Sequence, residues 1–230
     1  MSAFSKHLKF IKKLQQYTEQ EPIIRSKDIE MFINQAIDTW VDLTYKNFNG
    51  KEDLRKRLEP LIITKTITRS EADDNGSIEV GPRGGELWPF PTGSQIRYIY
   101  SELVQFNNST ALIPVKPVPV TYFNKQQSNP FKKPYRNLVW RTESDLSNGL
   151  VELIVDNAVI AKYIITYIKH PRHVNLHSNS QVDTDIDMAW EDEIIDIAVN
   201  IALNSYKLLG AFTPKPVAQP VQQQEQPRQE

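Results

Sequence analysis

Three histidines, at positions 170, 173 and 177, lie close together in the chain and are a first candidate for metal binding. A structural zinc site takes four ligands from cysteine, histidine or carboxylate side chains. The chain has no cysteine, the histidine spacing does not place all three on one helical face, and no neighbouring carboxylate triad completes a shell. We therefore predict surface histidines in a loop that leaves a strand, and no metal.

Aspartates at positions 183, 185 and 187 form the pattern D-x-D-x-D, which opens a calcium-binding loop. An EF-hand loop also requires glycine at its sixth position and glutamate at its twelfth. Here those positions hold Met188 and Ile194, so the pattern fails as a calcium site. Acidic side chains in front of a helix cap its N-terminus and complement its dipole, and this is the role that we predict.

The glycine-rich segment Gly81–Glu86, "GPRGGE", has neither the spacing nor the Lys-Ser/Thr pair of a phosphate-binding loop. We predict a turn in an exposed hairpin or flap. The chain also contains no G-x-S-x-G or H-E-x-x-H motif. The sequence therefore favours a protein that is not an enzyme and that carries no cofactor.

Residues 103–142 contain no aspartate or glutamate, but they carry six cations interleaved with aromatic side chains. The cations are Lys116, Lys125, Lys132, Lys133, Arg136 and Arg141. Such a segment suits a module that binds single-stranded nucleic acid, a lining for a passage through which DNA moves without sequence readout, or a β surface with solvated lysines. The residues leave these three interpretations open.

Charge is also concentrated elsewhere. Acidic residues crowd into positions 183–193, so that copies of the chain could bind head to tail through their acidic and basic segments. Two ordinary solvated surfaces are the alternative. The lysine-rich first helix offers a similar choice between nucleic acid or a membrane surface and packing against the core or a neighbour.

Helical periodicity locates the elements that must position these residues. The clearest apolar stripe runs from Ile29 to Val41, in a helix for which Ser26 is a credible N-cap. A long amphipathic helix closes the domain, with acidic residues at its start, as the helix dipole favours. The predicted helices cover residues 4–18, 26 onwards, 51–58 and 189–209.

A β block lies between the helices. In residues 110–123, the prolines at positions 114, 117 and 119 cannot donate ladder hydrogen bonds, so this strand should lie at an edge or form an extended arm. Asp156-Asn157 suits a tight hairpin turn between the last two strands. The predicted strands cover residues 61–69, 94–106, 110–123, 138–144, 149–156 and 158–170. Residues 94–106 start as a strand, but their later apolar residues would also fit a helix.

Composition and order of elements give the fold class. The chain has 230 residues, 40% of them apolar, a pI near 6.5, no signal peptide and no membrane-length apolar run. We predict a soluble intracellular α+β protein with N-terminal helices, a mainly antiparallel β block of sandwich or barrel type, and one long C-terminal helix. Its parts are a helical segment (1–60), a β-rich domain (61–170) with an arm and loop at 110–137, an acidic loop and helix (171–212), and a disordered Gln/Pro tail (213–230).

Several segments, in this order, resemble the ring and adaptor proteins of the head-to-tail connector in crAss-like tailed bacteriophages. They are "FINQAIDTWVDLTYKNF", "EDLRKRLEPLII", the Pro-Phe-x-x-Pro loop "NPFKKP", "YIITYIKHPRHVNL" and "WEDEIIDIAVNIALNSY". The resemblance spans roughly residues 26–209. The residues that fit its motifs are Tyr167, Ile168, Lys169 and Pro171, then Glu193, Ile194, Ile195, Asp196, Ala198, Val199, Ala202 and Leu203.

The resemblance implies a non-enzymatic virion protein, assembled in the host bacterial cytoplasm, that closes into a ring of about twelve copies. Its implied partners are itself, the portal, other tail or connector rings, and double-stranded DNA in passage; no membrane is implied. The alternative is the single-stranded nucleic-acid module of residues 103–142. We predict intersubunit contacts at Val115, Val118, Val120, Tyr122, Pro130, Phe131 and Pro134. We predict that Lys125, Lys132, Lys133 and Arg136 face the DNA passage.

Overall fold

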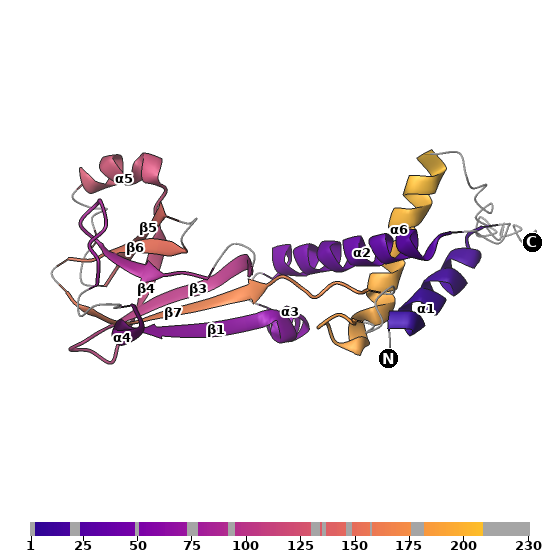
Figure 1. Cartoon of the computed structure of the whole chain (residues 1–230), viewed down its shortest axis with the longest axis horizontal. Helices are drawn as coiled ribbons and strands as arrows, with labels where there is room; N and C mark the ends of the chain where they lie inside the picture. The colour runs from indigo at the N-terminus through magenta and orange to yellow at the C-terminus, as the bar shows by residue number, and fades with distance from the viewer. Residues whose placement is uncertain are drawn as a thin grey trace, which may run out of the picture. The chain divides into compact units, whose positions relative to one another are not determined.

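The computed structural model describes most of the chain (Figure 1). The described residues are 3–18, 24–48, 51–72, 78–91, 95–129, 134, 137–145, 149–156, 158–175 and 182–208. They form two compact units: unit 1 comprises residues 1–57 and 172–230, and unit 2 comprises residues 58–171. The fold is mixed α+β, as the order of sequence patterns predicts.

Unit 1 is helical. Helix α6 packs against both α1 and α2, so that the first and last helices of the chain belong to the same core. The predicted stripe of α2 is buried from Ile29 to Val41, and Trp40 contacts Trp190 with ring centroids 6.4 Å apart. The helices are α1 (Ala3–Gln15), α2 (Ser26–Lys46), α3 (Glu52–Leu58), η3 (Met188–Trp190) and α6 (Glu191–Leu208).

Two helix starts differ from the prediction. Ser26 is the first residue of α2, and the cap position is Arg25, which makes no side-chain capping hydrogen bond. The C-terminal helix begins at Glu191 after a short 3₁₀ turn, and Asp187 caps that turn by accepting a hydrogen bond from the Ala189 N–H at 3.0 Å. The capping role predicted for the aspartates is thus confirmed at Asp187.

Unit 2 is a curled, mostly antiparallel sheet in which seven strands follow the order β1-β7-β3-β4-β5-β6-β2 (Figure 1). The one parallel pair among the named strands is β4 with β5. The strands are β1 (Ile62–Thr68), β2 (Glu86–Pro89), β3 (Ile96–Phe106), β4 (Leu112–Pro117), β5 (Val139–Asp145), β6 (Leu150–Ile154) and β7 (Ile160–Lys169). Three short helices accompany them: η1 (Glu59–Leu61), α4 (Arg69–Ala72) and α5 (Val120–Gln127).

The proline-rich strand β4 is not at an edge, so that prediction is wrong. Residues 112–114 pair with β3, whereas residues 115–117 pair with β5. Each residue of β4 therefore has a strand partner on one side only. A proline needs one unpaired side, and this staggered arrangement supplies it inside a sheet.

Three further predictions about unit 2 are corrected. Residues 120–123 are helical in α5, because strand β4 already ends at Pro117 and Pro119 occupies the helix N-cap. Strands β6 and β7 are not neighbours in the sheet, so Asp156 does not open a hairpin between them. Strand β2 was missed because its four residues, with a proline at the end, lie in a segment dominated by turn formers. Residues 96–106, for which a helix was also considered, are strand throughout.

Candidate assembly surface and buried polar clusters

Helix α5 presents the most exposed part of the predicted contact region. Phe123 anchors it to the sheet, with its ring 6.0 Å from that of Trp140 in an edge-on arrangement and with Val118 completing the cluster. Val120 and Tyr122, on the same helix, remain exposed at 43% and 56%. One buried aromatic thus holds a short helix whose other apolar side chains face solvent.

The seven predicted contact residues are therefore divided. Val118 is 2% exposed and belongs to the core of unit 2, and Val115 and Pro134 are half-buried. Val120 and Tyr122 are exposed on α5. Pro130 and Phe131 lie outside the described residues. The structure therefore separates Val118, which packs with Phe123 and Trp140, from the exposed Val120 and Tyr122.

The cations of the acid-free segment are divided as well. Lys116 and Lys125 are exposed and form no ion pair with any residue that the structure describes. Arg141 is 7% exposed and paired inside unit 2. Lys132, Lys133 and Arg136 lie outside the described ranges. Since Phe123 and Trp140 are also buried, two of the aromatics that a single-stranded nucleic-acid site would use for stacking are inside the fold.

Arg141 belongs to a buried cluster with Glu102 and Tyr163. Its Nε lies 2.9 Å from Oε1 of Glu102, and the Tyr163 hydroxyl donates a short hydrogen bond to the same oxygen. Burial, and then the Glu102 charge, raise the pKa of Tyr163 well above its usual range. The phenol therefore stays protonated and keeps donating, so that the carboxylate is matched by one cation and one hydroxyl.

The glycine-rich segment binds a second buried carboxylate. Glu152 is fully buried, and its Oε1 accepts hydrogen bonds from the N–H groups of Arg83 (2.8 Å) and Gly85 (2.9 Å). The Arg83 guanidinium lies 3.2 Å from Oε2. Gly81 and Gly85 are buried. The predicted hairpin turn is confirmed, because Val80 pairs with Glu86 across it, but the turn is exposed only in part, at Pro82 and Gly84. Its other side closes over Glu152, where a backbone rich in glycine can approach the carboxylate closely.

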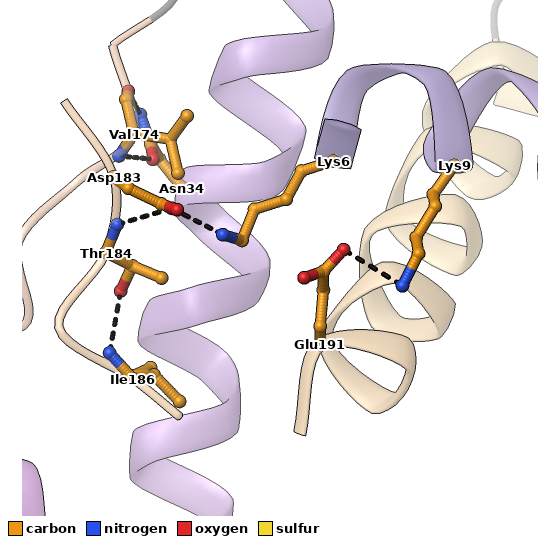
Figure 2. Close-up of polar contacts among 8 residues, drawn as sticks. All are labelled: Lys6, Lys9, Asn34, Val174, Asp183, Thr184, Ile186 and Glu191. Atoms are coloured by element: carbon orange, nitrogen blue, oxygen red, sulfur yellow. Dashed lines mark hydrogen bonds and ion pairs between the residues drawn. The ribbon is translucent and has the colours of Figure 1, made fainter. Parts of the chain in front are cut away.

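In unit 1 the lysines of α1 meet the acidic segment that precedes and opens α6. Figure 2 shows Lys6 directed at Asp183 and Lys9 directed at the buried Glu191 (3.1 Å). Glu191 is the largest influence in raising the pKa of Lys9. One turn further along α1, Lys13 pairs with Asp196. The first helix therefore packs within its own unit, which is one of the two roles that its sequence allowed.

Further contacts fix the acidic loop around these pairs. Asp183 also accepts a hydrogen bond from the Thr184 N–H, and Asn34 exchanges two hydrogen bonds with the backbone of Val174, at 2.8 and 3.0 Å (Figure 2). Arg57 pairs with Glu193 at 3.0 Å and lies over the Trp190 ring. These acidic side chains are thus occupied within unit 1, a third possibility that the sequence interpretation did not include.

Two of the three histidines, His170 and His173, lie where the sequence predicts. His170 and His173 are exposed after β7, and His173 lies 3.1 Å from an Asp38 oxygen; His177 lies outside the described residues. Within the described ranges, no group of three histidine or carboxylate side chains has the arrangement of a metal site. No helix in the same ranges is long and apolar enough to cross a membrane.

Comparison with known proteins adds one match. A family model described as phage tail ring protein 3/4, from the crAss-like phage ring proteins, matches residues 13–213. No curated protein matches the chain. The matched range includes parts of both units, from the last three residues of α1 to beyond the end of α6.

Proposed function

Because this chain belongs to the phage tail ring protein 3/4 family and is thus a structural protein of the virion, we propose that it forms a ring in the connector between portal and tail. In this proposal the ring has about twelve copies, surrounds the DNA passage and has no enzymatic activity. It assembles in the host bacterial cytoplasm and contacts the portal and neighbouring rings. The family match over most of the chain is the observation that carries the proposal.

The exposed apolar side chains of α5 are the proposed subunit contact. A ring needs two different, complementary surfaces on each subunit. Val120 and Tyr122 present apolar area on a helix that Phe123 fixes in place, and aromatic side chains are enriched where subunits meet. The segment that carries Pro130, Phe131 and Pro134 follows α5 in the sequence, and we propose that it extends the same contact.

Three lysines and one arginine of this region are the proposed DNA-facing groups. Lys125 lies on α5, and Lys132, Lys133 and Arg136 follow within a few residues. Cations without acidic partners attract the phosphate backbone without reading sequence, which suits a passage through which DNA slides. A buried and paired cation such as Arg141 cannot serve in this way.

Solution mass is the first test. Light scattering on the purified full chain, at low and moderate salt, should show a discrete closed oligomer of about twelve copies. If the chain stays monomeric alone, it should enter rings when mixed with the portal and the other ring proteins of its phage. A chain that stays monomeric in both settings contradicts the proposal.

A pair of surface variants tests the α5 contact. Val120→Ser with Tyr122→Ser should abolish the oligomer while leaving the unfolding midpoint nearly unchanged, because both side chains face solvent in the subunit. Thr121→Ser with Asn124→Ser, on exposed positions of the same helix, is the matched control and should assemble normally. Equal assembly of both pairs would remove α5 from the contact.

A further inference from the structure

The two edges of the sheet in unit 2 are built differently. At one edge, β2 has only four residues and ends in Pro89. Its outer side is already occupied, because Val80 pairs with Glu86 and the Leu87 N–H donates to the Glu79 carbonyl at 2.9 Å. This edge is closed by the chain itself, in the manner that natural sheets use to prevent further pairing.

At the other edge, β1 is open along its middle. The N–H of Ile62 donates to the Glu59 carbonyl, and the N–H of Thr68 donates to a Glu71 carboxylate oxygen at 2.7 Å. Both residues therefore point their backbone groups away from β7. Because backbone direction alternates along a strand, Thr64 and Thr66 point outward as well.

The side chains agree with this assignment. Thr64 faces Thr166 on β7, and their hydroxyl oxygens are 3.0 Å apart, as expected where two opposite residues exchange no backbone hydrogen bonds and approach closely. Nothing in the described part of the chain pairs with the outer side of Thr64 or Thr66. Strand β1 has seven residues, all of them β-branched except Lys65, and contains no proline. It is therefore suited to accept another strand at its open edge.

A second β1 strand is the wrong partner for a ring. Pairing of β1 with its own copy makes a two-fold contact that closes after two subunits. A ring requires a different segment of the neighbour as donor. The donor must have its own N–H groups free along one side, and a strand added at an edge should not itself recruit a further strand.

The segment 213–221, "TPKPVAQPV", has this pattern. Its prolines, at positions 214, 216 and 220, are all even-numbered, so in an extended chain they fall on one side. The N–H groups of residues 215, 217, 219 and 221 fall on the other side. Such a strand can pair through one edge only and ends a sheet at the other, which is the requirement stated above.

We propose that residues 213–221 of a neighbouring subunit add to β1 as an eighth strand and pair with Thr64 and Thr66. The nine residues are long enough to cover the seven of β1. This contact rests on the proposed ring and supplies it with a heterologous link: the acceptor is an edge of unit 2 and the donor follows α6. The prolines face outward and close the extended sheet.

Peptide binding tests the pairing directly. A chain that ends at Gly210 retains every described residue, and a synthetic peptide of residues 211–223 is the probe. Amide hydrogen exchange of Thr64 and Thr66 should slow by about tenfold or more at saturating peptide, while Lys65, already paired with Ile165, should not change. A peptide of identical composition with the residue pairs 214/215 and 216/217 transposed should protect neither residue. No slowing with the native peptide, or equal slowing with both, overturns the proposal.

Two variants of Thr66 test the role of β1 as the acceptor strand. Thr66→Pro removes one outward N–H and leaves the β7 ladder intact, whereas Thr66→Val keeps the N–H and the side-chain shape. Thr66→Pro should weaken peptide binding about tenfold or more, and Thr66→Val should bind as the parent does. If Thr66→Pro binds as the parent does, or if Thr66→Val loses binding equally, the edge pairing is wrong.

Cross-linking shows which subunit donates. The chain has no cysteine, so Thr64→Cys and Val217→Cys introduce single reactive sites. A mixture of the two single variants should give a cross-linked pair with a short bismaleimide, and the double variant should give a ladder of subunits. A double variant that cross-links only within one chain overturns the neighbour as donor.

Assembly of the shortened chain separates this inference from the proposed ring. If rings form without residues 211–230, this inference fails while the proposed ring stands. If the full chain never assembles, the proposed ring itself fails.

Discussion

Lys6 and Asp183 form an ion pair between residues that are 177 positions apart in the chain. Lys6 is only 4% exposed, and its ammonium group meets the carboxylate of the loop that leads to α6. The pair joins the first helix to the last within unit 1. A lysine-rich N-terminus and an acid-rich C-terminal segment, which look like two binding surfaces in the sequence, are therefore one intramolecular contact.

The first prediction concerns this pair. Lys6→Met should lower the free energy of unfolding by about 1–3 kcal/mol, because it leaves Asp183 without its cation at a half-buried position. Lys12→Met is the matched control: Lys12 lies on the exposed side of the same helix, and its loss should change stability by less than about 0.5 kcal/mol. Urea unfolding of both variants measures the difference. Equal effects would show that the pair contributes nothing specific.

The buried cluster of unit 2 gives the second prediction. Arg141→Met should cost about 3–5 kcal/mol, since Glu102 would remain buried with only the Tyr163 hydroxyl for a partner. Tyr163→Phe should cost less, about 1–3 kcal/mol, because the cation remains. The double variant Glu102→Leu/Arg141→Met should be more stable than Arg141→Met alone. A double variant that is less stable than the single one would contradict this account of the charge pair.

The loop over Glu152 gives the third prediction. A methyl group at position 85 would lie 2.6 Å from the Leu153 carbonyl oxygen and 2.8 Å from the Glu152 side chain, so Gly85→Ala should displace the loop and cost about 2–3 kcal/mol. Gly84 has a φ of +80° with open space around it. Gly84→Ala should therefore cost only about 1 kcal/mol from backbone strain. Thermal unfolding ranks the two, and the reverse order would contradict the buried carboxylate contact.

The lysines that we propose to face DNA give the fourth prediction. Lys125→Glu combined with Lys132→Glu and Lys133→Glu should leave the oligomer intact but impair genome retention or ejection in reconstituted particles, because the phosphate backbone would meet carboxylates. Lys27→Glu, at an exposed position of α2, is the control and should leave DNA handling unchanged. Normal DNA handling by the triple variant would place these lysines away from the passage.

Helices were predicted well from the sequence because their signal is local. The stripe of α2 and the end of α6 follow from the spacing of apolar residues over several turns. The strand order does not follow in this way, because pairing joins residues far apart. The prolines of β4 predicted an edge strand or an extended arm, whereas β4 lies between β3 and β5 and changes partner at Val115, a feature that is not encoded locally.

The candidate site was predicted only in part for the same reason. Val120 and Tyr122 are exposed, but the signal for α5 was a single proline at its start. Arg141 lies 39 residues from its partner Glu102 in the sequence. The Gly81–Gly85 loop binds Glu152, which lies 67 or more residues further along the chain. An acid-free segment therefore looked uniformly basic, although its most buried cation is neutralised by Glu102, one residue outside the segment.

The fifth prediction concerns pH and His7. Burial lowers the pKa of the His7 imidazole below 6.5, because the charged form is desolvated in α1. In the pH range from the pKa of folded His7 up to values just above 6.5, the unfolded chain therefore binds more protons than the folded chain. The free energy of unfolding rises as the pH increases across this range, and it falls as the pH decreases through the same range. His7→Gln has no such group and should lose less stability than the parent between about pH 7.5 and pH 5.5. Urea unfolding at matched pH values measures this, with all other titrating groups common to both proteins. Parallel curves for the two proteins would show that His7 does not resist protonation in the folded state.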